Sequence, residues 1–368
     1  MKLSACFRHS AAARRQEQSN GSPGVNRCSG FKSADMLIMG LFGGLLVLAV
    51  FSLTLGRYPV PVADIVRIVL STGLNEARPY TDTQWVVIEI VRLPRILLVT
   101  LCGMGLAMAG ASMQGVFRNP LVGPEVCGVS AGASFGGVLA IMLGWSAMGT
   151  VSLAFAFGLG ALVVAFGLAR LAGRSGTLSL VLAGVIIGAF FGALVGLAQY
   201  VADPQSKLPG IVYWLLGSFA GATYDKVALV AGVTLVAGSL LQALRWRINL
   251  LSLGDTDAEA LGINIEVLRW GVVALTALLV AAQVSVSGGV GWVGLIVPHL
   301  ARMLVGPEHS RLLPASALLG GLYLLAMDDL ARAATEQEIP IGLLTALIGT
   351  PVFALLFWKL QAKGWSHD

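Results

Sequence analysis

Long apolar stretches, separated by short polar segments, fill most of the chain after residue 35. Many of them reach the roughly 20 residues that a helix needs to cross the hydrocarbon core of a bilayer. The short alternating segments typical of membrane β-strands are missing. The pattern therefore predicts an all-α polytopic membrane protein with about ten transmembrane helices. Their expected ranges are 36–55, 93–116, 126–143, 147–170, 178–202, 226–245, 266–287, 293–305, 312–331 and 341–360.

Two of these helices are unusual. The third is interrupted near its start by Gly128 and Gly132, and the eighth is short and follows the glycine-rich run 287–294. A short helix after a glycine-rich break is typical of a re-entrant or discontinuous membrane element.

The polar connections predict the remaining organisation. Residues 1–35 are polar and basic, as expected of a disordered cytoplasmic tail. The longest connection, 56–92, is expected on the outer side with a short surface helix at 62–70. A second outer connection, 203–222, is expected to carry a short interfacial helix at 212–216, anchored by aromatic side chains.

The inner connection 246–265 contains a helix signal of its own. Thr256 and Glu259 have the spacing of a capping box, acidic residues crowd the first turn, and Gly262 can end the helix. We expect a short amphipathic helix on the cytoplasmic face. The alternative is a well-formed loop that lies on the lipid headgroups.

The run Arg-Asn-Pro-Leu-Val-Gly-Pro-Glu at 118–125 is the clearest break in an otherwise apolar region. Two prolines, a glycine and two charges are incompatible with a lipid-facing helix. This backbone must turn outside the hydrocarbon or line a cavity inside the protein. We therefore expect part of the functional site here.

Composition supports the membrane prediction and excludes a soluble domain. The chain has 368 residues, of which 56% are hydrophobic and 12% charged, and its mean hydropathy is +0.82. In a soluble protein the net charge of +5 would suggest nucleic acid. Here sixteen Lys and Arg fall on the predicted inner side and eight on the outer side. This bias predicts that both termini, including the tail 363–368, are cytoplasmic, and no nucleic-acid partner is expected.

Several residue groups have two interpretations. Gly184, Gly188, Gly192 and Gly196 share one helix face, which serves either ordinary packing or the smooth wall of a pathway. Asp328 and Asp329 are either members of a proton relay with His299 or partners in a local ion pair with Arg332.

Motifs for chemistry are missing from the sequence. There is no Gly-x-x-x-x-Gly-Lys-Ser/Thr phosphate loop and no convergent set of acid, base and nucleophile. Cys102 and Cys127 are best explained as small core residues, and no metal or cofactor site is predicted. The chain is not expected to be an enzyme, and any use of ATP must come from another chain.

Several motifs follow one another in a fixed order along the chain. They are Arg92–Arg95, Gly110–Gln114, Arg118–Leu121, Gly128–Ala133, Leu182–Gly184, Tyr213–Trp214 with Gly217, Leu261–Gly262, Gly294–His299, Arg302, Arg311–Pro314, Ile339–Gly342, Thr345–Ala346, and Gly349–Pro351 with Phe353. In this order they resemble the iron-siderophore, haem and vitamin B12 permease family of bacterial ABC importers. The resemblance covers about 36–362, which would form one permease domain of the type II importer fold. Among the departures from the pattern, Trp292 replaces a frequent Phe, 176–179 lacks a Ser/Thr run, residues 1–35 have no counterpart, and Glu336 and Glu338 add acid near Arg332.

The resemblance implies a homodimer in membrane lipid. Each subunit would dock on one cytoplasmic ATPase, which holds the ATP and magnesium, and a periplasmic binding protein would deliver the cargo. Matching positions are Arg92, Arg95 and Arg332 for docking of the binding protein, and Asn119, Leu121 and Thr177 for the cytoplasmic gate. Contact with the ATPase would fall within about 250–263, at Leu253, Gly254, Asp255, Ala258, Leu261 and Gly262.

The predicted function is import of an iron chelate, haem or a related metal cofactor such as cobalamin, driven by a separate ATPase. The glycine face from Gly184 to Gly196 belongs to the helix that flanks the pathway in this family. Two alternatives stay open, namely a proton-coupled secondary transporter that uses Asp328, Asp329 and His299, and a membrane-embedded enzyme. The sequence does not name the cargo.

Overall fold

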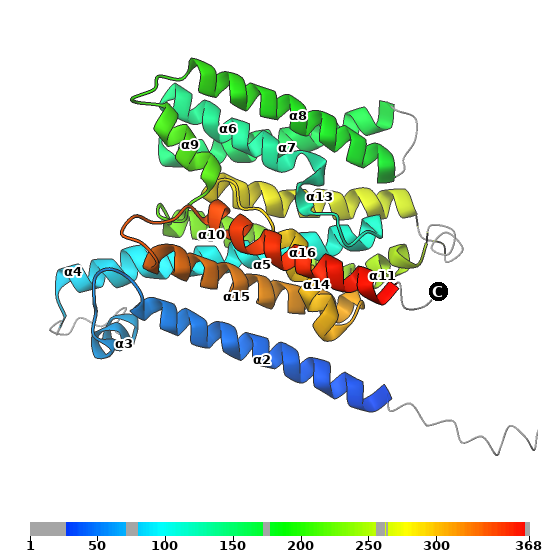
Figure 1. Ribbon diagram of the computed structural model, residues 1–368, viewed down its shortest axis with the longest axis horizontal. Helices are drawn as coiled ribbons and strands as arrows, with labels where there is room; N and C mark the ends of the chain where they lie inside the picture. Colours follow the sequence, from blue (N-terminus) through cyan, green and yellow to red (C-terminus); the bar gives the residue numbers. More distant parts are fainter. Residues whose placement is uncertain (1–26, 71–79, 172–176, 255–261, 263, 365–368) are drawn as a thin grey trace, which may run out of the picture. The chain divides into compact units, whose positions relative to one another are not determined.

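The computed structural model describes residues 27–70, 80–171, 177–254, 262 and 264–364. The chain divides into two compact units, Met1–Leu37 and Ile38–Asp368, and the helical bundle belongs to the second. Every regular element in the described ranges is a helix (Figure 1). The all-α prediction is therefore confirmed for these residues.

The described elements follow one another with short connections. They are α2 (Arg27–Thr54), α3 (Val62–Leu70), α4 (Asp82–Trp85), the π-helical η1 (Val86–Arg92), α5 (Leu93–Phe117), the 3-10 turn η2 (Pro124–Cys127), α6 (Val129–Leu143), α7 (Ala147–Leu171), α8 (Thr177–Val201), α9 (Leu208–Leu216), α10 (Tyr224–Ala243), α11 (Arg245–Leu253), α13 (Ile265–Ser287), α14 (Val293–Val305), α15 (His309–Ala333) and α16 (Ile341–Gly364).

Seven helices in the described ranges are long and apolar enough to cross a membrane. Three shorter apolar helices, Val129–Leu143, Val293–Val305 and Ile341–Leu356, coincide with predicted segments. A polytopic membrane protein is thus supported by length and composition, while a total of ten spans stays a prediction.

Helix α5 occupies the centre of the bundle. It packs against α10, α13, α14 and α15, and most of its side chains are buried. Glycines allow the closest approaches, because a Cβ added to Gly103 would lie 2.3 Å from the Gly320 carbonyl oxygen of α15. The centre of the protein is therefore held by backbone contacts as well as by side chains.

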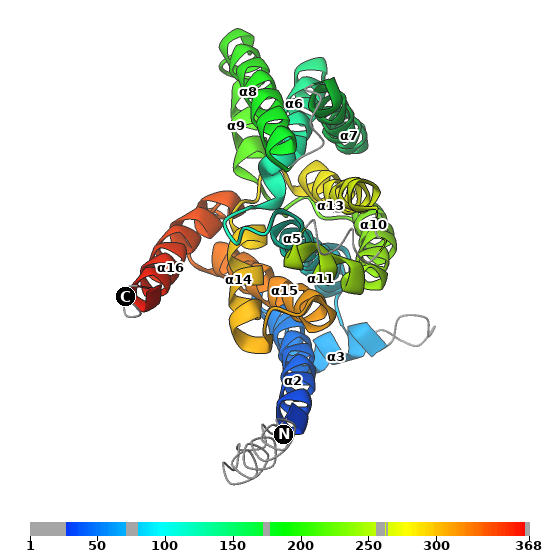
Figure 2. The same ribbon diagram turned by 90° about the vertical axis from the view of Figure 1, so that its right-hand side faces the viewer.

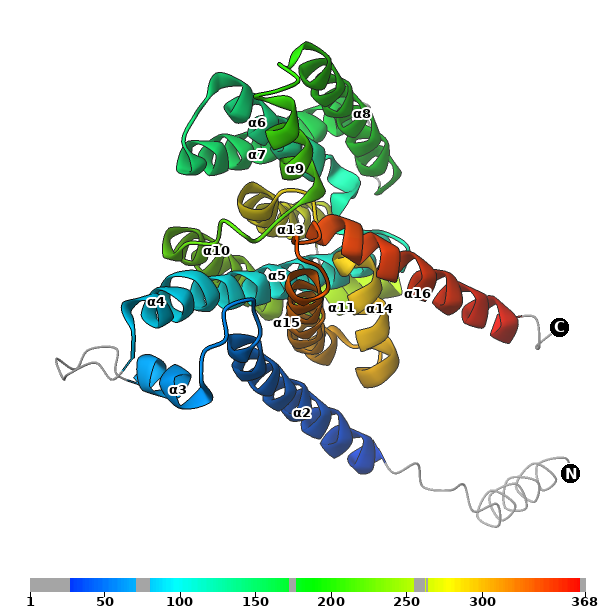
Figure 3. The same ribbon diagram turned by 60° about the vertical axis from the view of Figure 1, so that its left-hand side comes forward.

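Helices α6, α7, α8 and α9 form a second group, which Figures 2 and 3 show to one side of α5. Helix α6 packs closely on α7, and α13 touches both of them and α5. Helix α16 contacts α9, α14 and α15, and one end of it extends from the bundle (Figure 3). Its Leu355 and Trp358 are exposed. The η2 turn connects the two groups along the chain.

The segment 82–92 corrects the predicted loop 56–92. It is helical and continues directly into α5, so that the apolar span runs from Asp82 to Phe117. Thr81 and Gln84 form a capping box at its start, a signal that the sequence contained. The proline at 94 cannot donate a backbone hydrogen bond, and the preceding turn is the wider π-helix.

Other boundaries also differ from expectation. Helix α2 begins at Arg27, inside the segment expected to be a disordered tail, and α9 begins at Leu208 rather than 212. The inner connection 246–265 opens with α11, which was not predicted. The amphipathic helix expected at 255–262 falls almost entirely outside the described residues. The surface helix expected at 62–70 is confirmed as α3.

Candidate functional site

The polar break after α5 folds into a compact turn rather than a helix. Arg118 ends α5 with a left-handed backbone, φ 51°, and the Asn119 side chain accepts a hydrogen bond from the Leu121 amide at 2.9 Å. Pro124 opens η2, and Gly128, with φ 75°, separates η2 from α6. Gly132, in contrast, lies inside α6, so only one of the two glycines interrupts the predicted third helix.

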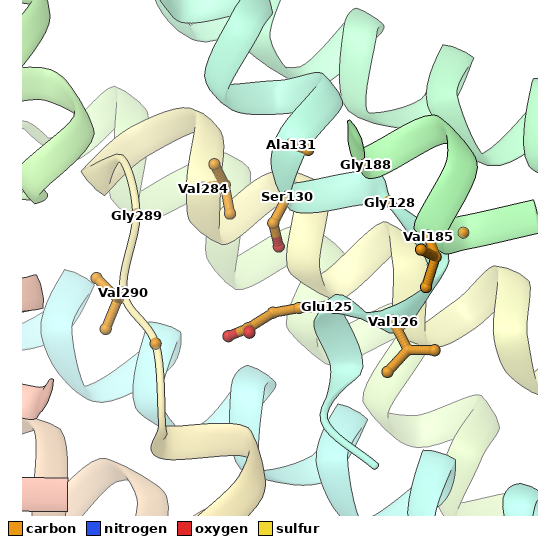
Figure 4. Close-up of a pocket in the computed structure, with 12 residues that line it drawn as sticks. Glu125, Val126, Gly128, Ser130, Ala131, Val185, Gly188, Val284, Gly289 and Val290 are labelled. Carbon is orange, nitrogen blue, oxygen red and sulfur yellow. The ribbon is translucent and has the colours of Figure 1, made fainter. Parts of the chain in front are cut away.

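This turn forms one wall of a pocket of about 440 Å³, which we name the η2 pocket. The other walls are the start of α6, Gly184–Gly188 of α8, Val284 of α13 and the loop 289–291. Figure 4 shows the Glu125 side chain reaching into this space, with the Ser130 hydroxyl directed to the same side. The break at 118–125 therefore helps to line a cavity, one of the two possibilities that its sequence allowed.

Glu125 is the charged residue of the η2 pocket in the part of the chain that the structure describes. The side chain is exposed to the pocket, and no hydrogen bond or ion pair joins it to another described residue. The protein around the pocket partly shields the carboxyl from water and raises its pKa above the usual range of a glutamic acid. The sequence analysis placed this residue at the end of the break but did not assign it a role.

The four glycines of α8 were expected to serve either close packing or the smooth wall of a pathway, and they differ in what surrounds them. A Cβ on Gly184 would lie 1.8 Å from the Val126 carbonyl oxygen, so this glycine serves close packing against η2. A Cβ on Gly188, Gly192 or Gly196 would meet no atom within 4 Å. The part of the helix face from Gly188 to Gly196 is thus free of contacts in a single chain. Gly184 and Gly188 both line the η2 pocket.

A matched pair of alanine variants tests this division. Gly184→Ala should displace η2 and lower the free energy of unfolding by about 1–3 kcal/mol, as expected for overpacking. Gly188→Ala, one helical turn later, should leave it nearly unchanged. Thermal denaturation of the two purified variants measures the difference, and equal stability would contradict the packing assignment.

The three predicted docking arginines converge on a second pocket of about 210 Å³, which we name the arginine pocket. Arg92, Arg95 and Arg332 are only 3%, 6% and 7% exposed. Arg57, which is exposed, also lines this pocket and was not among the predicted docking residues. Arg92 donates hydrogen bonds of 2.6 Å to the carbonyl oxygens of Leu53 and Tyr58, and so fixes the chain after α2.

Arg95 and Arg332 belong to a buried network of ions. Arg95 lies 2.9 Å from Asp328 and 3.0 Å from Glu338. Arg332 pairs with both Asp328 and Asp329, and the Ser52 hydroxyl donates to Asp329 at 2.6 Å. The network therefore joins α2, α5, α15 and the segment before α16.

This network supports the ion-pair interpretation of the two aspartates. Their carboxylates face arginines, and among the described residues no hydrogen bond joins either of them to His299. His299 lies buried in α14. A proton relay through these three residues is therefore not favoured.

The predicted gate and coupling residues lie in different parts of the chain. Asn119 and Leu121 are exposed, Thr177 begins α8, and no hydrogen bond joins this residue to the other two. Leu253 ends α11 and Gly254 follows it. Asp255, Ala258 and Leu261 lie outside the described residues, and Gly262 has φ 76°. Their roles stay predictions.

The helical membrane fold and the η2 pocket are compatible with a transport protein, and comparison with known proteins defines the class. The sequence profile of the FecCD transport family matches residues 44–359. This chain belongs to the FecCD transport family, and it is the permease subunit of an ABC importer.

Individual relatives agree with this assignment. The chain is 45% identical over 328 residues to the molybdate import system permease protein MolB of Haemophilus influenzae, covering 89% of this chain and 97% of that protein. It is 39% identical over 290 residues to the hemin transport system permease protein HmuU of Yersinia pestis, covering 77% and 86%. A solved inward-facing transporter described as metal-chelate type has 44% identity and a TM-score of 0.79, covering 88% and 99%.

Proposed function

We propose that this permease imports a metal chelate, such as an iron siderophore or haem, or a related metal cofactor such as cobalamin. The observation that carries the proposal is the η2 pocket, which brings Glu125, the last residue of the break, together with Gly184 and Gly188 of α8. A bulky, rigid cargo needs a smooth wall, and glycine supplies one because it has no side chain. The resemblance to the metal-chelate transporter and to the hemin permease supports the same cargo class.

The assembly follows from this class. Two copies would pair in the bacterial inner membrane with both termini cytoplasmic. Exposed apolar side chains on α8, among them Phe190 and Leu197, support burial of this helix against a second copy or lipid. Each copy would dock on an ATPase that holds ATP and magnesium, and closure of the ATPases would reorient the pair. This chain itself would bind no cofactor.

The arginine pocket is our proposed docking site for the substrate-binding protein. Guanidinium groups suit the capture of carboxylates, and the buried ions hold Arg95 and Arg332 in fixed positions. Because those two arginines already face acids of their own chain, exposed Arg57 is expected to make the first contact with an approaching acidic side chain.

Reversing the charge of Arg57 tests the docking site without breaking the buried network. Arg57→Glu should reduce the association rate of the binding protein about tenfold at low salt, with a smaller loss at high salt. Arg247→Glu, at an exposed residue of α11, should leave association unchanged. Surface plasmon resonance at two ionic strengths measures both variants. An unchanged rate for Arg57→Glu would place docking elsewhere.

Molybdate import is the second candidate function. The observation that favours it is the 45% identity to MolB over almost the whole of that protein. The two candidates differ in the size and charge of the cargo. Molybdate is a small dianion, whereas metal chelates are bulky and include neutral and positively charged species as well as anionic ones such as haem.

Uptake into liposomes distinguishes the candidates. The permease, its ATPase and its binding protein would be assembled and supplied in turn with a ferric siderophore, haem, cobalamin and molybdate. We expect import of a chelate that requires ATP and persists when the proton gradient is collapsed. Import by the permease alone, or import driven by the gradient, would contradict the proposal.

A further inference from the structure

The η2 pocket contains two polar groups that the protein leaves without partners. No hydrogen bond joins the Glu125 carboxylate or the Ser130 hydroxyl to another described residue. A Cβ added to Gly291 would lie 3.8 Å from a Glu125 carboxylate oxygen, so the carboxylate faces the loop 289–291 across the pocket. Figure 4 shows it pointing between Ser130 and Val290.

The charge of this pocket is uncompensated. Within the described ranges, the lining contains no Lys, Arg or His to offset Glu125, and its other members are glycine, alanine, valine and serine. Apolar walls weaken the screening of a charge, so one carboxylate acts strongly on anything that enters. An oxyanion site is normally built in the opposite way, with cations or converging N–H donors.

The start of α6 reinforces this contrast. Gly128, Ser130 and Ala131 line the pocket, so the N-terminus of α6 faces it. A helix N-terminus favours a negative charge, and here Glu125 already supplies one from the chain itself. A second anion would therefore meet a carboxylate rather than an open set of donors.

We propose that Glu125 determines the charge of the cargo that passes the η2 pocket and favours neutral or positively charged metal chelates over anionic cargo. Anionic cargo includes molybdate and, through its two propionates, haem. The inference rests on the proposed function in one respect, since it takes this pocket to lie on the route of the cargo. In a homodimer the second copy would add another Glu125 and double the effect.

Labelling of a cysteine in the pocket measures its charge without any cargo. Ser130→Cys would be introduced into a chain whose Cys6 and Cys28 are replaced by serine, because Cys102 and Cys127 are buried. The assembled transporter in membrane vesicles would be treated with cationic and anionic methanethiosulfonate reagents of similar size. Glu125→Gln should lower the ratio of the cationic to the anionic rate about tenfold, whereas Glu336→Gln, in a distant exposed segment, should not change it.

Two labelling results would overturn the assignment. In the first, the ratio of the cationic to the anionic labelling rate is the same whether residue 125 is Glu or Gln. In the second, neither reagent labels the Ser130→Cys thiol. Because this measurement needs no import, its result separates the role of Glu125 from the identity of the cargo.

Transport then tests the effect on cargo. With the ATPase and binding protein present, wild type should import a neutral ferric trihydroxamate in preference to molybdate, and Glu125→Gln should raise molybdate import relative to the trihydroxamate about fivefold or more. Rapid molybdate import by wild type that Glu125→Gln leaves unchanged would overturn the inference. Absence of import for every probe, combined with charge-dependent labelling, would contradict the proposed cargo class and leave the assignment of Glu125 standing.

Discussion

Asp328→Ala is expected to lower the free energy of unfolding by about 3–5 kcal/mol, because it removes one partner of a buried ion pair. Asp328 is 1% exposed and faces two guanidinium groups, Arg95 at 2.9 Å and Arg332 at 3.3 Å. Without its carboxylate, both arginines lose a charged partner on the buried side, while only 6% of Arg95 and 7% of Arg332 is exposed to water. Thermal or denaturant unfolding of the purified permease measures the loss.

Two further variants test whether the unpaired buried charge causes the loss of stability. Glu338→Gln should cost much less, since the Glu338 side chain is 29% exposed and water can replace it beside Arg95. The double variant Arg95→Met with Asp328→Leu should regain much of the lost stability, because it removes the buried charges together. A single variant Asp328→Ala as stable as wild type would show that the network does not hold α5 and α15 together.

Gly110→Ala is expected to have the second largest effect, about 3 kcal/mol of destabilisation, because two packed helices rather than a short turn would have to separate. A Cβ at this position would lie 1.8 Å from the Gly294 carbonyl oxygen and 2.9 Å from the Gly294 Cα. Both atoms belong to backbone, so no side-chain rotation can relieve the overlap. Helix α14 would have to move away from α5, taking the loop 289–291 of the η2 pocket with it.

The matched control is Gly232→Ala on α10, where an added Cβ would meet no atom within 4 Å. This variant should keep the unfolding temperature of wild type. Size-exclusion chromatography in detergent, followed by thermal unfolding, separates loss of folding from loss of stability. If both glycines tolerate alanine equally, α5 and α14 do not approach each other as closely as the structure shows.

Hydropathy predicted the positions of helices where an apolar run is bounded by polar residues, glycine or proline. The ranges expected at 293–305 and 62–70 agree with α14 and α3. The second span begins at Asp82 but was predicted to begin at 93, because the charges and the proline at 92–95 interrupt the apolar pattern although the helix continues through them. The capping box at Thr81 and Gln84 could have located its start.

The candidate site was predictable only in part. The residues of the break at 118–125 are incompatible with a lipid-facing helix, and its last residue, Glu125, lines a cavity, one of the two possibilities that the sequence allowed. The role of Glu125 was not predicted, since a glutamate after a proline carries no local signal. The exposed Arg57 was assigned to the outer side, but its place beside Arg92 and Arg332 could not be inferred from the chain order.

The sequence by itself determined the membrane class, most of the helices and the family, because hydropathy and motif order are properties of contiguous residues. Tertiary structure decided which residues meet. Arg95 and Asp328 are 233 positions apart and pair only because α5 and α15 pack together. Likewise, Gly184 is packed and Gly188 is open although both occupy the same helix face, because η2 reaches only the first of them.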